Sequence, residues 1–372
     1  MKYRLLDLIA CPACGGELHC NASVVSLPAG DSCEEVIEGE LLCQREHFYP
    51  IIKGIPRLLL PELLAETLRQ FQPQHYQRYR DRLPAAAAGE AVLKKKTLRS
   101  FSYQWNVFSE MYEHWEENFK SYFEPLVEPR DFSGKLVLDA GCGFGRHALY
   151  AGKYGAEVVA MDLSEAVESA YANTEKLAAV HVIQADIYQP PLRPLFDLVY
   201  CVGVIQHLPD PGKGFGSLSR FLSRNGELFV WVYGKRRGIY RLVDLIRPLT
   251  TKMPMQLLYL LTFVLNILSF LVFSLPYKLL RQLPGGKRLA AAWPFTRYAD
   301  LPLRVGHADW FDRLSVPSTV YFSRRDVEGW YAESGLEQVE LQSRDGIGWR
   351  ALGKSLESSM SHSIAMRKDN VL

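Results

Sequence analysis

The chain has 372 residues and a mass of 42.3 kDa, which predicts two or three domains and a sizeable apolar core. Its 48% hydrophobic and 23% charged residues exclude a disordered, collagen-like or disulfide-stapled protein. The net charge of +2 is unevenly distributed, because residues 235–288 carry ten Lys or Arg and a single acid, Asp244, while the rest sums to −7. A positively charged surface is therefore expected on this segment alone.

The N-terminal segment is rich in cysteine, with five of the seven cysteines in the first 43 residues. Two thiols three residues apart, followed by two glycines, have the form of a zinc knuckle, and a later Cys and His offer a second pair of ligands. We expect residues 1–60 to form a zinc-ribbon-like module; the alternative is a ribbon that has lost its metal. The expected metal ligands are Cys11, Cys14, Cys43 and His47, and the spare candidates are Cys20 and Cys33.

The apolar run before Cys11 is short and interrupted by Asp7, so it does not have the core of a secretory signal. This predicts a reducing, cytoplasmic location.

Residues 61–130 are expected to form a helical linker and an aromatic cap. Nine aromatic residues, spaced three to four apart between Phe101 and Phe123, predict one helix with an aromatic face that ends before Pro125. Such a face belongs either to the core or to a cap over a pocket.

Beyond residue 134, apolar strand-like runs alternate with helical stretches, and the pattern resumes near residue 324 after a long insertion. This alternation predicts a Rossmann-like, doubly wound α/β fold with a mostly parallel seven-stranded sheet, whose last two strands form an antiparallel pair. The expected segments are 131–234 (first part of this core), 235–322 (basic and apolar helical insertion), 323–354 (last helix and two strands) and 355–372 (flexible tail).

A glycine-rich loop follows the first of these strands, with the pattern Gly141-x-Gly143-x-Gly145 and Asp139 two residues before it. Glycines let the backbone turn tightly and approach a ligand closely. The spacing differs from the G-x-G-x-x-G of dinucleotide sites, and a carboxylate beside the loop suits a cationic ligand better than a pyrophosphate.

This loop resembles the first motif of class I S-adenosylmethionine-dependent methyltransferases, and acids after the second and third strands are similar to the later motifs of that family. The resemblance implies that S-adenosyl-L-methionine is the cofactor; the alternative is a similar fold that has lost its ligand. The cofactor-binding residues implied are Asp139, Gly141, Cys142, Gly143, Gly145, Asp162, Asp186, Ile187 and Val202.

The N-terminal module carries a second resemblance, in Gly39–Cys43 and in Tyr49–Leu59, to small zinc-ribbon proteins that activate methyltransferases. It implies that an activator-like module is fused to the enzyme, with Zn²⁺ as a second cofactor.

The family reaction is an in-line methyl transfer, which depends mainly on alignment and needs a base only if the acceptor loses a proton. The candidate catalytic residues are His207, Tyr233, His307 and Asp309. For His207 the alternative is a structural histidine that shapes its loop.

The insertion contains 21 uncharged residues, Met255 to Leu275, enough for a helix that matches a hydrocarbon core of about 30 Å. Strands of one sheet lie before and after it, so a single crossing is excluded and the segment must return. The alternatives are a re-entrant hairpin broken near Asn266 or Ser269, a helix in the membrane plane, a lid over the pocket, or a buried or dimer-contact helix. Its basic flanks favour docking to an anionic membrane surface.

We therefore expect a methyltransferase acting on a small-molecule or lipid-like acceptor, such as a quinone or isoprenoid, on the cytoplasmic face of the membrane. The alternative is an rRNA or tRNA base methyltransferase, because a zinc ribbon before this fold also resembles bacterial rRNA guanine N1-methyltransferases. A non-catalytic cofactor-binding partner is a third reading, which the three retained carboxylates disfavour. The sequence does not indicate an oligomeric state.

Overall fold

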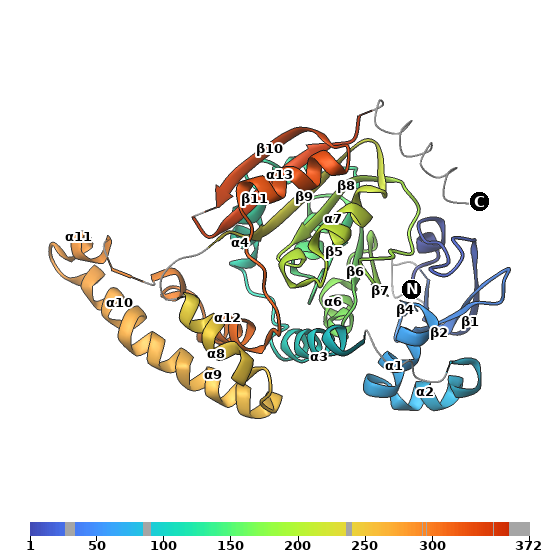
Figure 1. Cartoon of the computed structure of the whole chain (residues 1–372), viewed down its shortest axis with the longest axis horizontal. Helices are drawn as coiled ribbons and strands as arrows, with labels where there is room; N and C mark the ends of the chain where they lie inside the picture. Colours follow the sequence, from blue (N-terminus) through green and yellow to red (C-terminus); the bar gives the residue numbers. More distant parts are fainter. Residues whose placement is uncertain are drawn as a thin grey trace.

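The computed structural model describes residues 1–26, 34–84, 91–235, 240–291, 293–294, 296–344 and 346–356. Within these ranges one mixed sheet of eleven strands runs through the molecule in the order β1-β2-β3-β4-β7-β6-β5-β8-β9-β11-β10 (Figure 1). Seven of these strands belong to the doubly wound core that the sequence predicts. The sheet is larger than predicted because four strands of the N-terminal module extend one edge.

The N-terminal module continues the core sheet instead of standing apart from it. Its strands are β1 (Leu18–Ser26), β2 (Glu35–Cys43), β3 (Phe48–Ile52) and β4 (Ile55–Leu58), preceded by the 3-10 turn η1 (Tyr3–Asp7). The first three pairings are antiparallel, and β4 then pairs in parallel with β7 (Val180–Ala185). The ammonium group of Lys2 also donates to the carbonyls of Leu177 and Val180, at 2.7 Å each. The module is thus fixed to the core by backbone pairing as well as by the chain.

The core strands place their carboxyl ends along one edge of the sheet. They are β5 (Leu136–Ala140), β6 (Glu157–Asp162), β7, β8 (Phe196–Val202) and β9 (Leu222–Tyr233), all parallel, followed by β10 (Glu337–Arg344) and β11 (Gly348–Lys354). The final pair is antiparallel, as predicted. The turn residue Asp345 lies outside the described residues.

Helices cover both faces of the core sheet. One face packs against α7 (Pro211–Ser219) and α13 (Arg324–Glu333), and the other against α4 (Trp115–Phe123), α5 (Arg146–Lys153) and α6 (Ala166–Thr174). The remaining helical segments of the first half are α1 (Pro61–Phe71), α2 (Pro73–Tyr79), η2 (Arg80–Arg82) and η3 (Pro129–Phe132). Within the predicted linker region, residues 85–90 lie outside the described residues.

The aromatic segment forms two helices where the sequence pattern predicts one. Helix α3 (Ala91–Val107) ends before Phe108, and α4 begins at Trp115. The rings on either side of this break enter different clusters: Phe108 packs with Leu258 and Phe311, whereas Phe119 packs in the sheet core. One straight helix could not reach both clusters.

The insertion is a helical arm that projects from the sheet (Figure 1). It consists of α8 (Tyr240–Thr250), α9 (Met255–Ser269), the π-helical turn η5 (Phe270–Ser274), α10 (Leu275–Gln282), α11 (Gly286–Ala291), η6 (Thr296–Tyr298) and α12 (Leu303–Ser315). Met255–Gln282 is one continuous helix of 28 residues, long and apolar enough to cross a membrane by length and composition alone. The helix continues through Asn266 and Ser269, so the re-entrant hairpin considered above does not form there.

Candidate functional site

The glycine loop connects β5 to α5 at the carboxyl edge of the sheet. Gly141, Gly143 and Gly145 have φ values of 85°, 53° and 82°, a region that side chains disfavour. A Cβ at Gly145 would lie 2.9 Å from the Ala170 Cα, and one at Gly141 would collide with Val204. The loop therefore requires glycine at these positions, and it exposes backbone to the cavity beside it.

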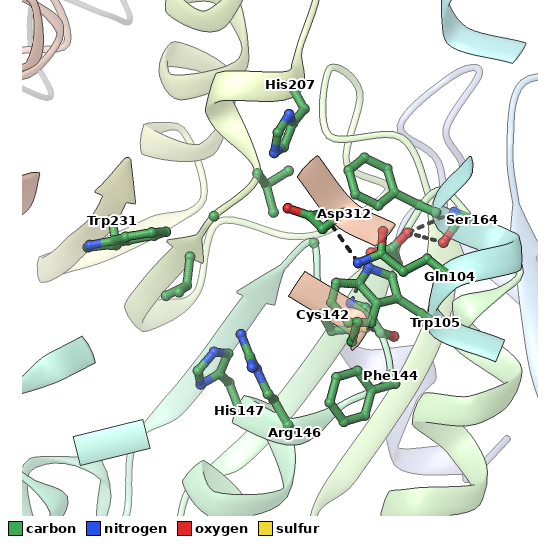
Figure 2. A pocket seen from close by; sticks show the side chains of 18 of the residues that line it. Gln104, Trp105, Cys142, Phe144, Arg146, His147, Ser164, His207, Trp231 and Asp312 are labelled. Carbon is green, nitrogen blue, oxygen red and sulfur yellow. Dashed lines mark hydrogen bonds between the residues drawn. The ribbon is translucent and has the colours of Figure 1, made fainter. Parts of the chain in front are cut away.

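Asp162, at the end of β6, is held by the loops on both sides of the cavity. One carboxylate oxygen accepts the backbone N–H of Gly143 at 3.0 Å. The other accepts the N–H and hydroxyl of Ser164 at 2.8 and 2.7 Å (Ser164 is labelled in Figure 2). Burial raises the pKa of Asp162, although these hydrogen bonds favour the charged form. The side chain is thus fixed against the cavity wall.

Asp139 lies beneath the glycine loop and does not line the cavity. It is buried, and within the described residues its Oδ2 atom has no hydrogen-bond partner. Burial raises the pKa of Asp139 to about 7. Its carboxylate would therefore act on a bound cation as a buried charge behind the loop, while the sequence-based expectation was a direct ligand contact.

The other predicted cofactor residues surround one cavity of about 300 Å³. Those that line it are Gly141, Cys142, Gly143, Asp162, Asp186, Ile187 and Val202. Gly145 instead precedes α5 as its N-cap residue. The structure thus brings seven of the nine predicted residues to a single concave site at the carboxyl ends of β5 to β8, the usual ligand position in this fold.

An aromatic and aliphatic cap closes the cavity on the side away from the sheet. Phe101 and Trp105 from α3 line it, and the Trp105 ring lies 5.2 Å from that of Phe144. Leu301 and Val305, at the base of the arm, line it as well. The α3 part of the aromatic segment therefore caps the cavity, whereas α4 packs in the sheet core, so the segment takes both of the roles considered for it.

A polar group lies at the arm end of the cavity. The Asp312 carboxylate accepts the Gln104 amide at 3.2 Å and lies 3.5 Å from the Tyr233 hydroxyl (Figure 2). His207, in the 3-10 turn η4 (Ile205–His207), lines the same region, with Nδ1 3.1 Å from the Ser318 carbonyl. Because a carbonyl only accepts, Nδ1 carries the proton. Burial lowers the pKa of His207, and the neighbouring Asp312 opposes that shift.

The two α12 candidates face different sides of their helix. Asp309 lines the cavity and forms an ion pair with Arg313, with oxygen–nitrogen distances of 2.6 and 3.1 Å. His307 faces α9, where its Nε2 lies 3.1 Å from the Thr262 hydroxyl and 3.0 Å from the Tyr259 carbonyl. His307 therefore joins two helices and is absent from the cavity lining, so we do not retain it as a catalytic candidate.

Sequence reasoning missed several polar cavity residues, among them Asp312, Gln104 and Arg146. Asp312 follows Asp309 by three residues and so shares its helix face. Gln104 lies in the aromatic segment, where only the aromatic residues form a recognisable pattern, and Arg146 directly follows the glycine loop. The i, i+3 spacing would have revealed Asp312, but no local signal places Gln104 beside it.

The N-terminal cluster fits a tetrahedral metal ion. The ligand atoms of Cys11, Cys14, Cys43 and His47 all lie within 4.8 Å of one another. Cys14 Sγ is 3.8 Å from Cys43 Sγ, and His47 Nδ1 is 3.3 and 3.5 Å from the Cys43 and Cys11 sulfurs. Ideal zinc bond lengths give about 3.8 Å between two sulfurs and about 3.5 Å between sulfur and nitrogen. The four residues thus suit Zn²⁺; Cys20 is not among them, and Cys33 lies outside the described residues.

Comparison with known families agrees with this division of the chain. A family described as "Methyltransferase domain" matches residues 138–230, from the first core strand to the fifth. Residues 138–230 form a methyltransferase domain. A second family, "Trm112p-like protein", matches residues 2–54. The predictions of a class I S-adenosylmethionine-dependent methyltransferase, and of a fused module similar to methyltransferase activators, are both confirmed by these matches.

Curated relatives resemble the methyltransferase domain over part of their length. An uncharacterized protein of Synechococcus sp. is 33% identical over 131 residues, covering 28% of this chain and 31% of the relative. The ubiquinone biosynthesis O-methyltransferase of Thiobacillus denitrificans is 29% identical over 150 residues, covering 36% and 64%. That of Aromatoleum aromaticum is 28% identical over 148 residues, covering 33% and 58%. The chain thus spans between about one third and two thirds of the length of these relatives.

Among solved structures, a complex that includes the Haloferax volcanii Trm112 methyltransferase activator has a TM-score of 0.42 at 13% identity, covering 70% of this chain and 98% of that one. Human N-acetylserotonin methyltransferase in complex with S-adenosylmethionine has a TM-score of 0.43 at 12% identity, covering 79% and 70%.

Proposed function

We propose that the protein transfers the methyl group of S-adenosylmethionine to a hydrophobic small-molecule acceptor, a quinone, isoprenoid or lipid-like compound, at the cytoplasmic face of a membrane. The observation that carries this proposal is the single cavity in which the glycine loop, Asp162 and Asp186 lie opposite an aromatic cap. Acids beside the loop suit a sulfonium, and Asp162 suits the ribose hydroxyls.

The cavity is lined mainly by apolar side chains with a few polar groups. Its apolar members include Phe101, Phe108, Leu208, Pro209, Tyr298, Leu301, Val305 and Ala308. Burial of a planar or polyisoprenoid acceptor is favourable against such a wall. The names of the curated relatives, ubiquinone biosynthesis O-methyltransferases, support an acceptor of this chemical class.

For an acceptor that reacts through a hydroxyl group, a base must remove its proton. We assign this role to Asp312, whose carboxylate Gln104 and Tyr233 hold at the cavity wall. Burial raises the pKa of Tyr233 well above its usual value, so its hydroxyl remains a donor. His207 carries its proton on Nδ1, so its Nε2 is an acceptor, 3.4 Å from the Gln206 side-chain amide, and Asp309 forms an ion pair with Arg313. Asp312 would take the proton of the acceptor hydroxyl and bound S-adenosylmethionine would supply the methyl group, so that the products would be a methyl ether and S-adenosylhomocysteine.

The arm supports a membrane-surface location because its polar side chains face inward and its apolar side chains face outward, the opposite of what is usual in a soluble protein. The face of α9 that packs on α12 is partly polar: the Thr262 hydroxyl contacts His307, and the Asn266 amide donates to the Leu303 carbonyl at 2.9 Å. The outward residues are apolar and 37% to 58% exposed: Leu257, Leu260, Phe263, Val264, Leu268, Leu271, Val272, Leu275 and Leu279. Small and polar residues between helices, with apolar residues outside, are typical of lipid surroundings.

Charge at the ends of this helix fits an anionic leaflet. Lys252 precedes it, Lys278 and Arg281 lie in its last turns, and Met255–Gln282 contains no acid. Both ends of the insertion lead back to strands of the same sheet, β9 before and β11 after. The helix therefore lies along one leaflet and does not cross the bilayer, with each basic residue adding about 1 kcal/mol of attraction near the surface.

Labelled methyl transfer tests the reaction and the acceptor class together. The protein is incubated with S-adenosylmethionine carrying a labelled methyl group and with bacterial membranes or total RNA. We expect label in the organic-extractable fraction, and Asp162→Asn should abolish it. Label that appears only in RNA would instead support the base-methyltransferase alternative, which the names of the relatives do not favour.

Liposome flotation tests the location. The wild type should float with vesicles containing phosphatidylglycerol and remain at the bottom with neutral vesicles in high salt. Replacing Leu260, Leu268 and Leu271 by Gln should abolish flotation, while a control with Val24 and Val339 replaced by Gln, which removes exposed apolar groups elsewhere, should float normally. A wild-type protein that fails to float would reject membrane docking and leave the transferase proposal standing.

A further inference from the structure

The loop that follows β6 carries the acid at the cavity wall, and its position depends on contacts outside the methyltransferase domain. Asp162, Leu163 and Ser164 line the cavity. The N–H and the hydroxyl of Ser164 both donate to the Asp162 carboxylate, so the position of that carboxylate depends on the position of Ser164. The residues on either side of Ser164, Leu163 and Glu165, are the ones that the surrounding structure holds in place.

Gln184, fully buried on β7, connects this loop to the N-terminal module. Its side-chain nitrogen donates to the Leu163 carbonyl at 3.0 Å and to the Glu165 carboxylate at 2.9 Å. Its side-chain oxygen accepts the Arg57 guanidinium of β4 at 3.0 Å. Because a guanidinium only donates and a carbonyl only accepts, these contacts are compatible with a single orientation of the Gln184 amide. Arg57 therefore selects the orientation in which Gln184 holds the loop.

Two further contacts hold the same loop from opposite sides. The Leu163 side chain packs against a cluster that includes Ile52 and Leu59 of the module. The Glu165 N–H donates to the hydroxyl of Ser102, on the cap helix α3, at 3.1 Å. The loop thus lies between the module and the cap, and the Arg57 network is its polar contact with the module.

Stability alone is a poor reason for a fully buried arginine at this place. Buried ion pairs add little net stability, because apolar residues of similar volume often stabilise a protein as well or better. The parallel pairing of β4 with β7 already joins the two parts of the chain. An apolar residue at position 57, however, could not fix the direction of the Gln184 amide. The arrangement therefore suits the precise placement of a neighbouring loop.

We propose that Arg57, acting through Gln184, positions residues 163–165 and thereby raises the affinity of the protein for S-adenosylmethionine. This inference rests on the proposed function, in which Asp162 binds the ribose hydroxyls of the cofactor. Without Arg57 the Gln184 amide can turn over, which places its oxygen against the Leu163 carbonyl and moves the loop. Arg57 is not among the residues that line the cavity, so it is a positioning residue.

The equilibrium affinity for S-adenosylmethionine tests this role. It is measured by calorimetry on the full chain, at a temperature where circular dichroism shows each variant to be folded. We expect Arg57→Met to bind about 5- to 50-fold more weakly than the wild type. The matched control is Lys53→Met, because Lys53 is also a module cation and pairs with Glu168 at 3.1 Å, but its side chain is 60% exposed. Its affinity should stay within about 2-fold of the wild type.

Three further variants separate positioning from stability. Adding Glu165→Gln to Arg57→Met removes the uncompensated charge, so this double variant should recover stability without recovering affinity; it also serves as the test if Arg57→Met alone does not fold. Arg57→Lys keeps a cationic donor for Gln184 and should bind more tightly than Arg57→Met. In an Asp162→Asn background, Arg57→Met should weaken binding by less than about 2-fold, because the side chain that it positions is already altered.

The contrary outcomes are distinct from one another. Wild-type affinity in the Arg57→Met and Glu165→Gln double variant, or an equal loss in Lys53→Met, would overturn the positioning role. A full effect of Arg57→Met in the Asp162→Asn background would overturn the route through Asp162. Failure of the wild type to bind S-adenosylmethionine would overturn the proposed function itself.

Discussion

The contact between the N-terminal module and the methyltransferase domain includes a buried network of charged side chains. Breaking this network should lower the free energy of unfolding. Arg57 on β4 is fully buried, 3.4 Å from Glu165, 3.2 Å from Glu168 and 3.0 Å from the Gln184 side-chain oxygen. Glu165 is 6% exposed, so Arg57→Met would leave a nearly dry carboxylate without its cation. Breaking a buried pair in this way costs about 3–5 kcal/mol.

Urea unfolding of the whole chain measures this cost. The surface pair Arg4–Glu157, whose side chains are 52% and 28% exposed, is the matched control; Arg4→Met should cost less than about 1 kcal/mol. Adding Glu165→Gln to Arg57→Met should recover about 0.5–3 kcal/mol, because the uncompensated charge is then gone. A loss below 1 kcal/mol in Arg57→Met, or no recovery in the double variant, would refute the reasoning.

Three further predictions concern the metal, a buried acid and the proposed base. Elemental analysis should find one zinc per chain in the wild type and in Cys20→Ser but none in Cys43→Ser; a wild type without zinc, or loss of zinc from Cys20→Ser, would contradict the cluster assignment. Burial raises the pKa of Asp139 to about 7 in the folded protein, whereas an Asp in the unfolded chain has a pKa of about 3.9. Between these two values the folded state binds more protons than the unfolded state. The contribution of Asp139 therefore lowers the free energy of unfolding as the pH rises from about 4 to 7. Asp139→Asn should therefore gain stability relative to the wild type between pH 5 and pH 8, by up to about 4 kcal/mol; a difference that does not change with pH would contradict this. Asp312→Asn should reduce methyl transfer to a hydroxyl acceptor by about 10²- to 10⁴-fold with unchanged affinity for S-adenosylmethionine, and full activity would exclude Asp312 as the base.

The cofactor end of the site was predictable because its residues are local in sequence. The glycine loop and the acids Asp162 and Asp186 each follow a strand directly, and parallel strands bring their carboxyl ends to one edge. The zinc ligands were predictable for a similar reason, since each pair lies within five residues. Both sites are therefore predictable from residues that lie close together in the sequence.

The features that the sequence does not predict depend on contacts between residues that are far apart in the chain. Strand β4 has four residues and pairs with β7, which lies more than 120 positions away in the chain. So short a segment has no sequence pattern that predicts which strand it pairs with. Gln104 and Asp312 meet only because α3 and α12 pack together. The opposite orientation of His307 and Asp309 was, however, accessible from helical geometry, because residues two apart on a helix do not share a face.

The most direct test of the central claim is the equilibrium affinity of the protein for S-adenosylmethionine, compared between the wild type, Asp162→Asn and the exposed control Asp7→Asn. Asp162 accepts three hydrogen bonds at the cavity wall, and an amide cannot accept from both loops at once. We predict binding by the wild type and by Asp7→Asn, with at least a tenfold loss in Asp162→Asn. Equal affinity in all three, or no binding by the wild type, would contradict the account.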